Sequence, residues 1–209
     1  PVLIVAPLGV TVQTAYEEAP KLGYKVNIIN HEVINGLNII NYEQLDNIDC
    51  SQFSGVVLDE SSILKNFTGK VRTKLTNYFK DTEFKLCCTA TPAPNDLMEL
   101  LNHADFLGIT TTAKALATYF INDMKTGDYR LKGHATKDFY RWCCTWSINV
   151  ESPQDLGFQA DYYQLPKLIE DTIILEIDVI DDEFENGLFR EVGTSATSFH
   201  KEKSSNLQS

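Results

Sequence analysis

Two adjacent carboxylates, Asp59 and Glu60, directly follow the apolar run of residues 56–58. A buried strand that ends in two acids places carboxylates at the edge of a sheet, where open α/β proteins bind ligands. Such a pair suits phosphoanhydride hydrolysis, because one carboxylate can hold Mg²⁺ while the other orients the attacking water. The same pattern is also typical of a strand that ends in a solvated turn.

A second strand-like run ends in the sequence Thr89-Ala90-Thr91-Pro92. Small hydroxyl residues at a strand end can bond a group near a phosphate or a neighbouring strand end, and Pro92 prevents the strand from continuing. A simple strand stop before a helix cap is the alternative. We predict that the tips carrying Asp59 and Thr89 lie side by side and rim one cleft.

The first apolar run, residues 2–6, leads into Pro7 and then into Thr11 and Thr14 at the start of a predicted helix. A helix N-terminus with short polar side chains suits phosphate oxygens, although ordinary capping explains the same residues. Lys65 could reach a nucleic-acid backbone, but an isolated lysine is more often simply solvated.

Strands that alternate with helices predict an α/β fold with a mostly parallel sheet. We expect strands at 2–6, 25–30, 38–42, 56–59 and 84–89, and helices at 12–22, 68–79 and 95–102. Beyond residue 110 the pattern predicts helices at 112–124 and 134–148, a polar loop at 128–134, an irregular segment at 151–171 and one more strand at 172–180. Aromatic residues are dense in the second of these later helices, which indicates a packing face more than a base-stacking surface.

The formal net charge of the 209 residues is −11, yet residues 51–145 carry 12 basic and 10 acidic side chains. This balance argues against a chain coated in nucleic acid and leaves room for a local groove. The five cysteines show no Cys-x-x-Cys spacing, which favours small buried side chains in a reducing compartment. The sequence has no basic leader and no apolar run of about 18 residues, so we expect a cytoplasmic protein.

In their order along the chain, these motifs resemble the core of superfamily-2 DEAD/DEAH-like helicases. Residues 2–14 look like motif Ia, 40–45 like the Ib/Ic region, 56–60 like Walker B (motif II) and 89–92 like motif III. Asp-Glu-Ser-Ser followed by Ile-Leu-Lys-Asn is similar to the Asp-Glu-Ala-His-x-x-Lys-Asn pattern of Swi/Snf-type double-stranded DNA translocases, and segments 129–135 and 155–157 resemble phage-encoded members.

The resemblance implies a three-layer RecA-like (P-loop NTPase) parallel sheet that is incomplete at its N-terminus and carries a helical insertion. The implied parts are a RecA-like lobe at 1–110, the helical insertion at 111–150, a linker and strand at 151–180, and an acidic-to-polar tail at 181–209 that could begin a second lobe.

The resemblance also implies roles for individual residues. Asp59 would bind Mg²⁺, and Glu60 would be the base for water attack on ATP. Thr89, Ala90 and Thr91 would couple the nucleotide state to DNA contact. The implied DNA-contacting residues are Pro7, Thr14, Asn41, Tyr42, Lys65 and Asn66.

Two departures from the family pattern are visible in the sequence. Ser61-Ser62 replaces Ala-His, and no Gly-x-Gly-Lys-Thr phosphate loop is present. We therefore expect a fragment of the first RecA-like lobe of an ATP-dependent DNA helicase or translocase, whose partners are ATP, Mg²⁺, double-stranded DNA and a second RecA-like lobe of the same parent. The alternatives are a non-catalytic nucleic-acid-binding or scaffold module with a helicase-like shell, and the motor lobe of a restriction-type endonuclease.

Overall fold

A computed structural model describes residues 1–30, 32–66, 69–122, 128–159 and 166–170. The chain divides into two compact units, Pro1–Glu151 and Ser152–Ser209. Within the described ranges, no helix is long and apolar enough to cross a membrane.

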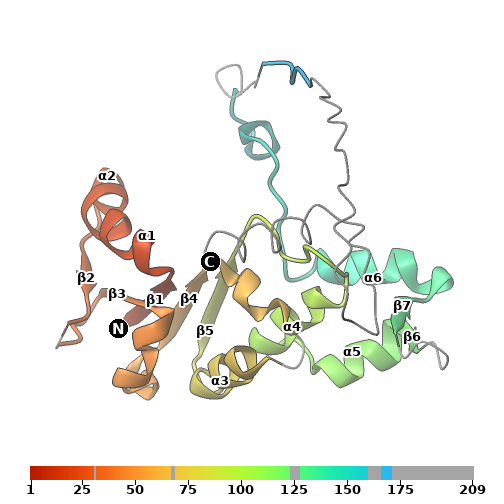
Figure 1. Cartoon of the computed structure of the whole chain (residues 1–209), viewed down its shortest axis with the longest axis horizontal. Helices are drawn as coiled ribbons and strands as arrows, with labels where there is room; N and C mark the ends of the chain where they lie inside the picture. Colours follow the sequence, from red (N-terminus) through yellow and green to blue (C-terminus); the bar gives the residue numbers. More distant parts are fainter. Residues whose placement is uncertain (31, 67–68, 123–127, 160–165, 171–209) are drawn as a thin grey trace, which may run out of the picture. The chain divides into compact units, whose positions relative to one another are not determined.

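The first unit contains a five-stranded sheet with the strand order β2-β3-β1-β4-β5 (Figure 1). All of its pairings are parallel, which confirms the predicted α/β class. The strands, each rich in apolar residues, are β1 (Val2–Ala6), β2 (Val26–Ile28), β3 (Leu37–Asn41), β4 (Gly55–Asp59) and β5 (Phe84–Cys88).

Helices cover both faces of this sheet, because successive strand residues point to opposite faces and both sets are apolar. On one face, Ala6 and Ile39 pack with Ala15 of a helical segment that follows β1. On the other, Leu3 and Leu58 join a larger core that is closed by later helices. The first segment comprises α1 (Leu8–Gln13), the π-helical η1 (Thr14–Glu18) and α2 (Ala19–Lys21). The later segments are the 3₁₀ helices η2 (Tyr42–Asn47), η3 (Cys50–Gln52) and η4 (Ser61–Lys65), and the helices α3 (Lys70–Tyr78) and α4 (Glu99–Phe106).

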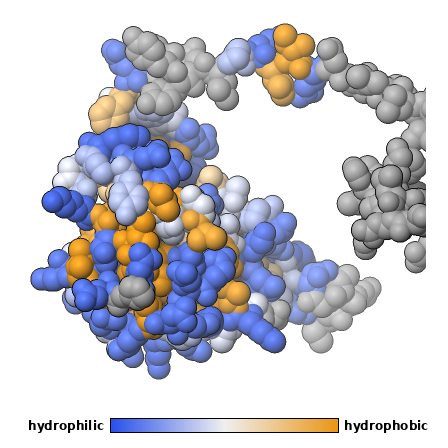
Figure 2. Space-filling view, turned by 60° about the vertical axis from the view of Figure 1, so that its left-hand side comes forward, coloured by the Kyte–Doolittle hydropathy of each residue, from blue (hydrophilic) through white to orange (hydrophobic). Residues whose placement is uncertain are grey.

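The β5 end of the sheet is only partly covered. Phe84 and Leu86 are 65% and 53% exposed, and the register places them on the same face as Val57 of β4. No described strand pairs with the outer edge of β5. β2 lies at the other end of the strand order, and on the side that carries α2 and β2 hydrophobic residues also reach the surface (Figure 2). A parallel sheet normally buries both faces, so the exposed apolar groups on β5 are unusual.

The rest of the first unit is a smaller layer with its own core. It comprises α5 (Thr112–Tyr119), β6 (Phe120–Asn122), β7 (Tyr129–Leu131), the 3₁₀ helix η5 (Gly133–Ala135) and α6 (Thr136–Cys143). Because β7 pairs with β6 in antiparallel register, the prediction of a plain loop over 128–134 is wrong.

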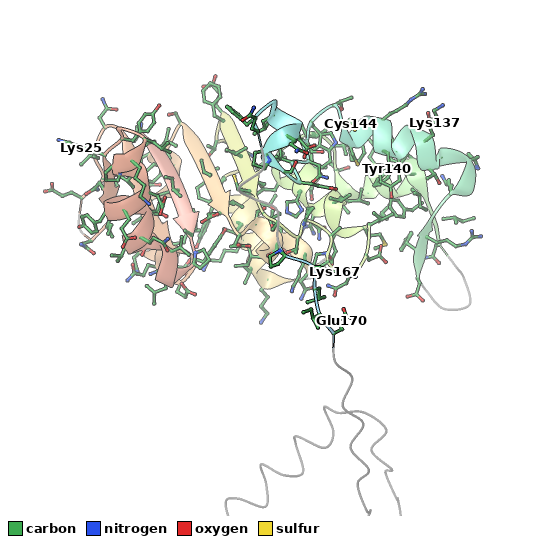
Figure 3. All side chains as sticks on the ribbon, turned by 90° about the horizontal axis from the view of Figure 1, so that it is seen from above. Lys25, Lys137, Tyr140, Cys144, Lys167 and Glu170 are labelled. Atoms are coloured by element: carbon green, nitrogen blue, oxygen red, sulfur yellow. The ribbon has the colours of Figure 1, made fainter. Side chains whose placement is uncertain are left out.

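The aromatic residues of α6 form a packing face, as predicted. Phe139 is fully buried, and Trp142 stacks on Tyr119 with ring centroids 5.3 Å apart. The opposite side of this helix is exposed, and it carries Lys137 and Tyr140 (Figure 3).

Two helix starts differ from the predictions. The helix that we expected to begin after a Thr11 cap begins at Leu8, and the Thr11 hydroxyl donates to the Leu8 carbonyl inside it. Asn95 does not cap α4, which begins at Glu99. Instead, the side-chain amide of Asn95 donates to the Glu99 carboxylate. Both predictions failed because a polar side chain near a helix start can bond a neighbouring group as easily as a main-chain N–H.

The described part of the second unit contains one short helix, η6 (Pro153–Leu156), in the segment predicted to be irregular. A reciprocal capping box between Ser152 and Asp155 fixes its start. The strand predicted at 172–180 and the tail at 181–209 lie outside the described residues.

Candidate functional site

The carboxyl ends of β4 and β5 are neighbours. Asp59, the last residue of β4, is paired with Cys88, the last residue of β5, so Thr89 follows directly beside it. This register confirms the prediction that the tips with Asp59 and Thr89 lie side by side. All five strands run in one direction, so β1 and β3 end at the same edge, where Ala6 is paired with Asn41.

Glu60 has an unusual backbone conformation at this edge. Its φ and ψ of 52° and 49° lie in the left-handed helical region. Within the described residues, it is the one position other than glycine with a positive φ. This region is unfavourable for a side chain with a Cβ, and such strain is concentrated at functional sites. The turn leaves Glu60 exposed and Asp59 half-buried, while the Glu60 N–H donates to Asp59 Oδ1 over 3.1 Å.

Tyr42 forms a hydrogen bond with Asp59, the residue before Glu60. Its hydroxyl donates to the main-chain carbonyl of Asp59 over 2.7 Å. Burial, followed by the nearby Cys87, Asp59 and Glu60, raises the pKa of Tyr42 far above its usual value. The phenol is therefore a neutral donor at any physiological pH.

His103 forms a hydrogen bond with Ser61, the residue after Glu60. Its Nε2 lies 3.2 Å from the Ser61 hydroxyl, and its Nδ1 lies 3.3 Å from the Glu99 carbonyl. A carbonyl can only accept, so Nδ1 carries the hydrogen and Nε2 accepts from Ser61. Burial lowers the pKa of His103, which keeps the ring neutral as this arrangement requires.

The helix α4 presents three buried polar residues toward the motifs. Glu99, Asn102 and His103 are 9%, 0% and 3% exposed. Asn102 Nδ2 donates to the carbonyls of Leu64 and Lys65, at 2.9 and 3.2 Å. These contacts attach α4 to the C-terminal end of η4, the helix that follows the acidic pair, while His103 contacts its first residue, Ser61.

Glu99 bonds the segment that follows the second motif. Its carboxylate accepts from the side-chain and main-chain nitrogens of Asn95, at 2.8 and 3.3 Å. Sequence analysis missed this polar face of α4. The available signal was the spacing of Glu99, Asn102 and His103, which places three polar residues on one side of an otherwise largely apolar helix.

The structure separates the predicted nucleic-acid contacts into two groups. Asn41 is buried, and its side chain accepts from the Gln44 N–H as the cap of η2. Tyr42 is committed to the Asp59 carbonyl. By contrast, Lys65 and Asn66 are exposed at the end of η4.

The remaining predicted residues lie at the ends of β1 and β5. Pro7 is the N-cap of α1, and Thr14, half-buried, begins the π-helical turn of the same segment. Thr89 Oγ1 accepts from the Thr91 N–H over 3.1 Å, which forms a tight turn that exposes Ala90 and Thr91. The exposed polar groups near the acidic pair are therefore those that follow β4 and β5.

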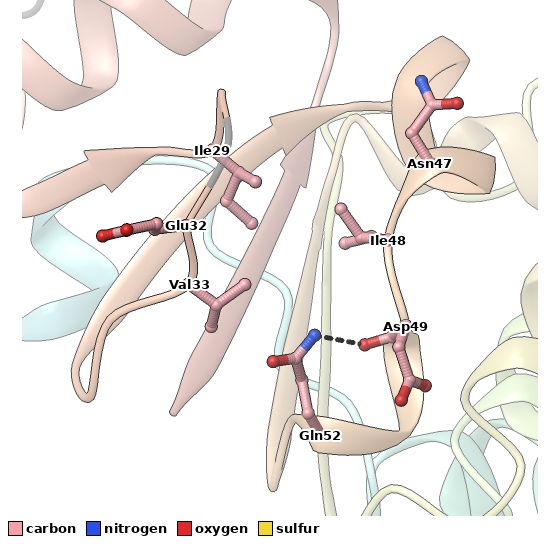
Figure 4. Close-up of a pocket in the computed structure, with 7 residues that line it drawn as sticks. All are labelled: Ile29, Glu32, Val33, Asn47, Ile48, Asp49 and Gln52. Carbon is pink, nitrogen blue, oxygen red and sulfur yellow. Dashed lines mark hydrogen bonds between the residues drawn. The ribbon is translucent and has the colours of Figure 1, made fainter.

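A shallow pocket of about 360 Å³ lies elsewhere, between the β2–β3 connection and the segment that joins η2 to η3 (Figure 4). Gln52 Nε2 closes part of its wall by donating to the Asp49 carbonyl over 2.7 Å. It is lined by Ile29, Glu32, Val33, Asn47, Ile48, Asp49 and Gln52, none of which belongs to the predicted site.

The donor set at the sheet edge suits a hard cation bound largely through water. In the described ranges, no group of three or more His, Cys, Asp or Glu side chains is arranged to hold a metal ion. Asp59 and Glu60 supply two carboxylates, and Mg²⁺ commonly uses one or two protein carboxylates and fills its shell with water and phosphate oxygens. The residues present therefore fit Mg²⁺ and do not form a closed metal cage.

Neither a scan against protein-family models nor a search of curated proteins finds a match for this chain. The functional argument therefore depends on the geometry of the strand ends.

Proposed function

We propose that this chain is part of the first RecA-like lobe of an ATP-dependent DNA helicase or translocase that moves on duplex DNA. One observation carries the proposal: Asp59 and Glu60 end β4 directly beside the Thr89–Thr91 turn that ends β5. Nucleotide hydrolysis needs acidic groups and polar strand ends at one edge of a parallel sheet, and this edge has both.

The two carboxylates differ in ways that suit different roles. Asp59 is half-buried and hydrogen-bonded to the Glu60 N–H, so its position is fixed and it suits a metal ligand. Glu60 is exposed and can face a water molecule near the terminal phosphate of ATP. When bound, Mg²⁺ would offset the charge of the phosphate oxygens.

The DNA side of the proposal depends on the exposed polar groups beside this edge. Lys65 and Asn66 end the helix that starts one residue after Glu60, and Thr91 ends the turn after β5. Contacts of this kind would engage the phosphate backbone, so binding should weaken with salt and show little sequence preference.

Such a motor also needs a phosphate-binding loop and a second lobe with an arginine finger. No Gly-x-Gly-Lys-Thr sequence occurs in the chain, so we propose that further sequence of a longer parent supplies both. Among the described residues, no strand pairs with the outer edge of β5, and Phe84 and Leu86 are exposed there. This supports the proposal, because it leaves room for another strand and a covering helix.

The metal site can be tested by NMR with Mn²⁺, a paramagnetic substitute for Mg²⁺. We expect Mn²⁺ to broaden the amide signals of residues 59–61 and 89–91 in the wild type and not in Asp59→Asn. Asp138→Asn, which changes an exposed carboxylate on α6, is the matched control and should behave as the wild type. Absence of broadening in the wild type, or equal broadening in Asp59→Asn, would overturn the metal assignment.

A second measurement tests the need for the missing parts. The 209-residue chain should hydrolyse ATP no faster than its Glu60→Gln variant. Turnover that depends on Glu60 in this chain alone would show that neither the phosphate loop nor the second lobe is required.

A further inference from the structure

A half-buried tyrosine and a buried histidine bond the residues on either side of Glu60. Tyr42 donates to the carbonyl of Asp59, one residue before it, over 2.7 Å. His103 lies 3.2 Å from the hydroxyl of Ser61, one residue after it. The two anchors come from different elements, η2 and α4, on the face of the sheet that holds the larger core.

We propose that Tyr42 and His103 are positioning residues that hold Glu60 in its left-handed conformation and so aim its carboxylate outward from the sheet edge. What the aimed carboxylate does rests on the proposed function, but the positioning itself is a property of the fold. An unfavourable backbone conformation persists only where the surrounding structure over-determines it, and here both neighbouring residues are fixed.

Relaxation of the turn would separate both hydrogen-bonded pairs. Ser61 is fully buried, so its hydroxyl would move away from His103 inside the protein if the turn at Glu60 relaxed to an extended conformation. The Asp59 carbonyl would likewise move away from the Tyr42 hydroxyl. The free-energy cost of breaking either hydrogen bond therefore opposes relaxation of Glu60.

The helix that carries His103 also contacts the chain that follows the second motif. Glu99, one turn before His103, accepts from both nitrogens of Asn95, which lies four residues beyond Thr91. The helix α4 thus contacts the residue after Glu60 and the segment after Thr91.

The test measures the backbone conformation of Glu60 directly, by NMR scalar couplings and chemical shifts that report φ, without nucleotide or metal. We expect a positive φ in the wild type. Tyr42→Phe and His103→Leu should each lower the ratio of left-handed to extended conformers at Glu60 by about fivefold, the value of one typical hydrogen bond. His103→Gln, which can still accept from Ser61, should restore much of the wild-type ratio.

Matched controls separate positioning from general destabilisation. Tyr140→Phe and His134→Leu change exposed residues of the same types and should leave φ at Glu60 unchanged. Variants that unfold more easily but show the wild-type ratio of left-handed to extended conformers at Glu60 would overturn the proposal. If His103→Leu does not fold, Ser61→Ala removes the same hydrogen bond from the other side and decides the question together with Tyr42→Phe.

This result is independent of the Mn²⁺ experiment. A chain that binds no Mn²⁺ but shows the lower ratio of left-handed to extended conformers in Tyr42→Phe would refute the proposed function and support the positioning. Mn²⁺ binding with an unchanged φ in both variants would support the proposed function and refute the positioning.

Discussion

The hydroxyl group of Tyr42 donates a hydrogen bond to the main-chain carbonyl of Asp59 over 2.7 Å. Tyr42 follows β3 and Asp59 ends β4, so the bond spans β1, which lies between those strands. It therefore fixes the end of β4 relative to a strand with which β4 does not pair. The sequence resemblance assigns Tyr42 to a DNA track, whereas the structure gives its polar atom a partner inside the site.

Tyr42→Phe removes this hydroxyl and little else. Because the phenol is largely buried and its carbonyl partner would be left unsatisfied, we expect the free energy of unfolding to fall by about 1–2 kcal/mol. Urea denaturation of Tyr42→Phe and of the exposed control Tyr140→Phe measures the difference. Equal stability of the two variants would mean that the hydrogen bond contributes nothing to the fold.

Glu60→Gly should stabilise the protein, although it removes a residue of the proposed site. A residue with a Cβ is strained at a φ of 52°, and glycine is not. After allowance for the greater freedom of glycine in the unfolded chain, we expect a gain of about 0.5–1 kcal/mol. Glu60→Ala removes the same carboxylate but keeps the strain, so thermal unfolding of this control should show no such gain. A loss of stability in Glu60→Gly would contradict the strained conformation.

The sequence was sufficient to predict the sheet and the meeting of its motifs. Apolar runs of strand length that alternate with helical patterns predict parallel strands, and the acidic pair and the threonines each end such a run. Once β4 and β5 pair in register, Asp59 and Thr89 must lie at one edge. This part of the site follows from local pattern and strand direction alone.

The anchors of the site could not be predicted in the same way, because they depend on contacts between residues distant in sequence. His103 lies 42 residues from Ser61, and Tyr42 lies 17 residues from Asp59. The short strands β6 and β7 were missed for a related reason, since three-residue strands carry too little alternation to be distinguished from a loop.

Stability should fall as the pH is lowered past the usual pKa of histidine. Burial lowers the pKa of His103 in the folded state, whereas the unfolded residue titrates near about 6.5. At pH values between the lowered pKa of the folded state and about 6.5, the unfolded state therefore binds more protons than the folded state. The contribution of His103 to the free energy of unfolding is complete above about pH 6.5. It is lost as the pH falls toward the lowered pKa of the folded state. Two other titratable groups lie near this contact: Glu99, whose charge opposes the shift in the pKa of His103, and Cys87, whose pKa is raised to about 12 by burial.

Urea denaturation between pH 7 and pH 5 tests this pH dependence. His103→Gln should lose less stability than the wild type over that interval, because glutamine does not titrate. His134→Gln, at an exposed histidine, should retain the wild-type slope. If the free energy of unfolding of His103→Gln fell with pH as steeply as that of the wild type, the pH dependence would belong to other groups.

Because one face of β5 is exposed, we expect substitution of Leu86 in β5 to cost much less stability than substitution of Leu58 in β4. Leu86 is 53% exposed, whereas Leu58 of β4 is fully buried in the larger core. Leu86→Thr introduces a β-branched residue, which suits a strand, and should change the free energy of unfolding by less than about 1 kcal/mol, while Leu58→Ala should cost about 2–5 kcal/mol. Because Leu86 is an exposed apolar residue of a strand whose outer edge pairs with no described strand, Leu86→Thr should also reduce self-association in sedimentation experiments at high protein concentration. If Leu86→Thr were as destabilising as Leu58→Ala, the face of β5 would have to be covered in solution by part of the same chain.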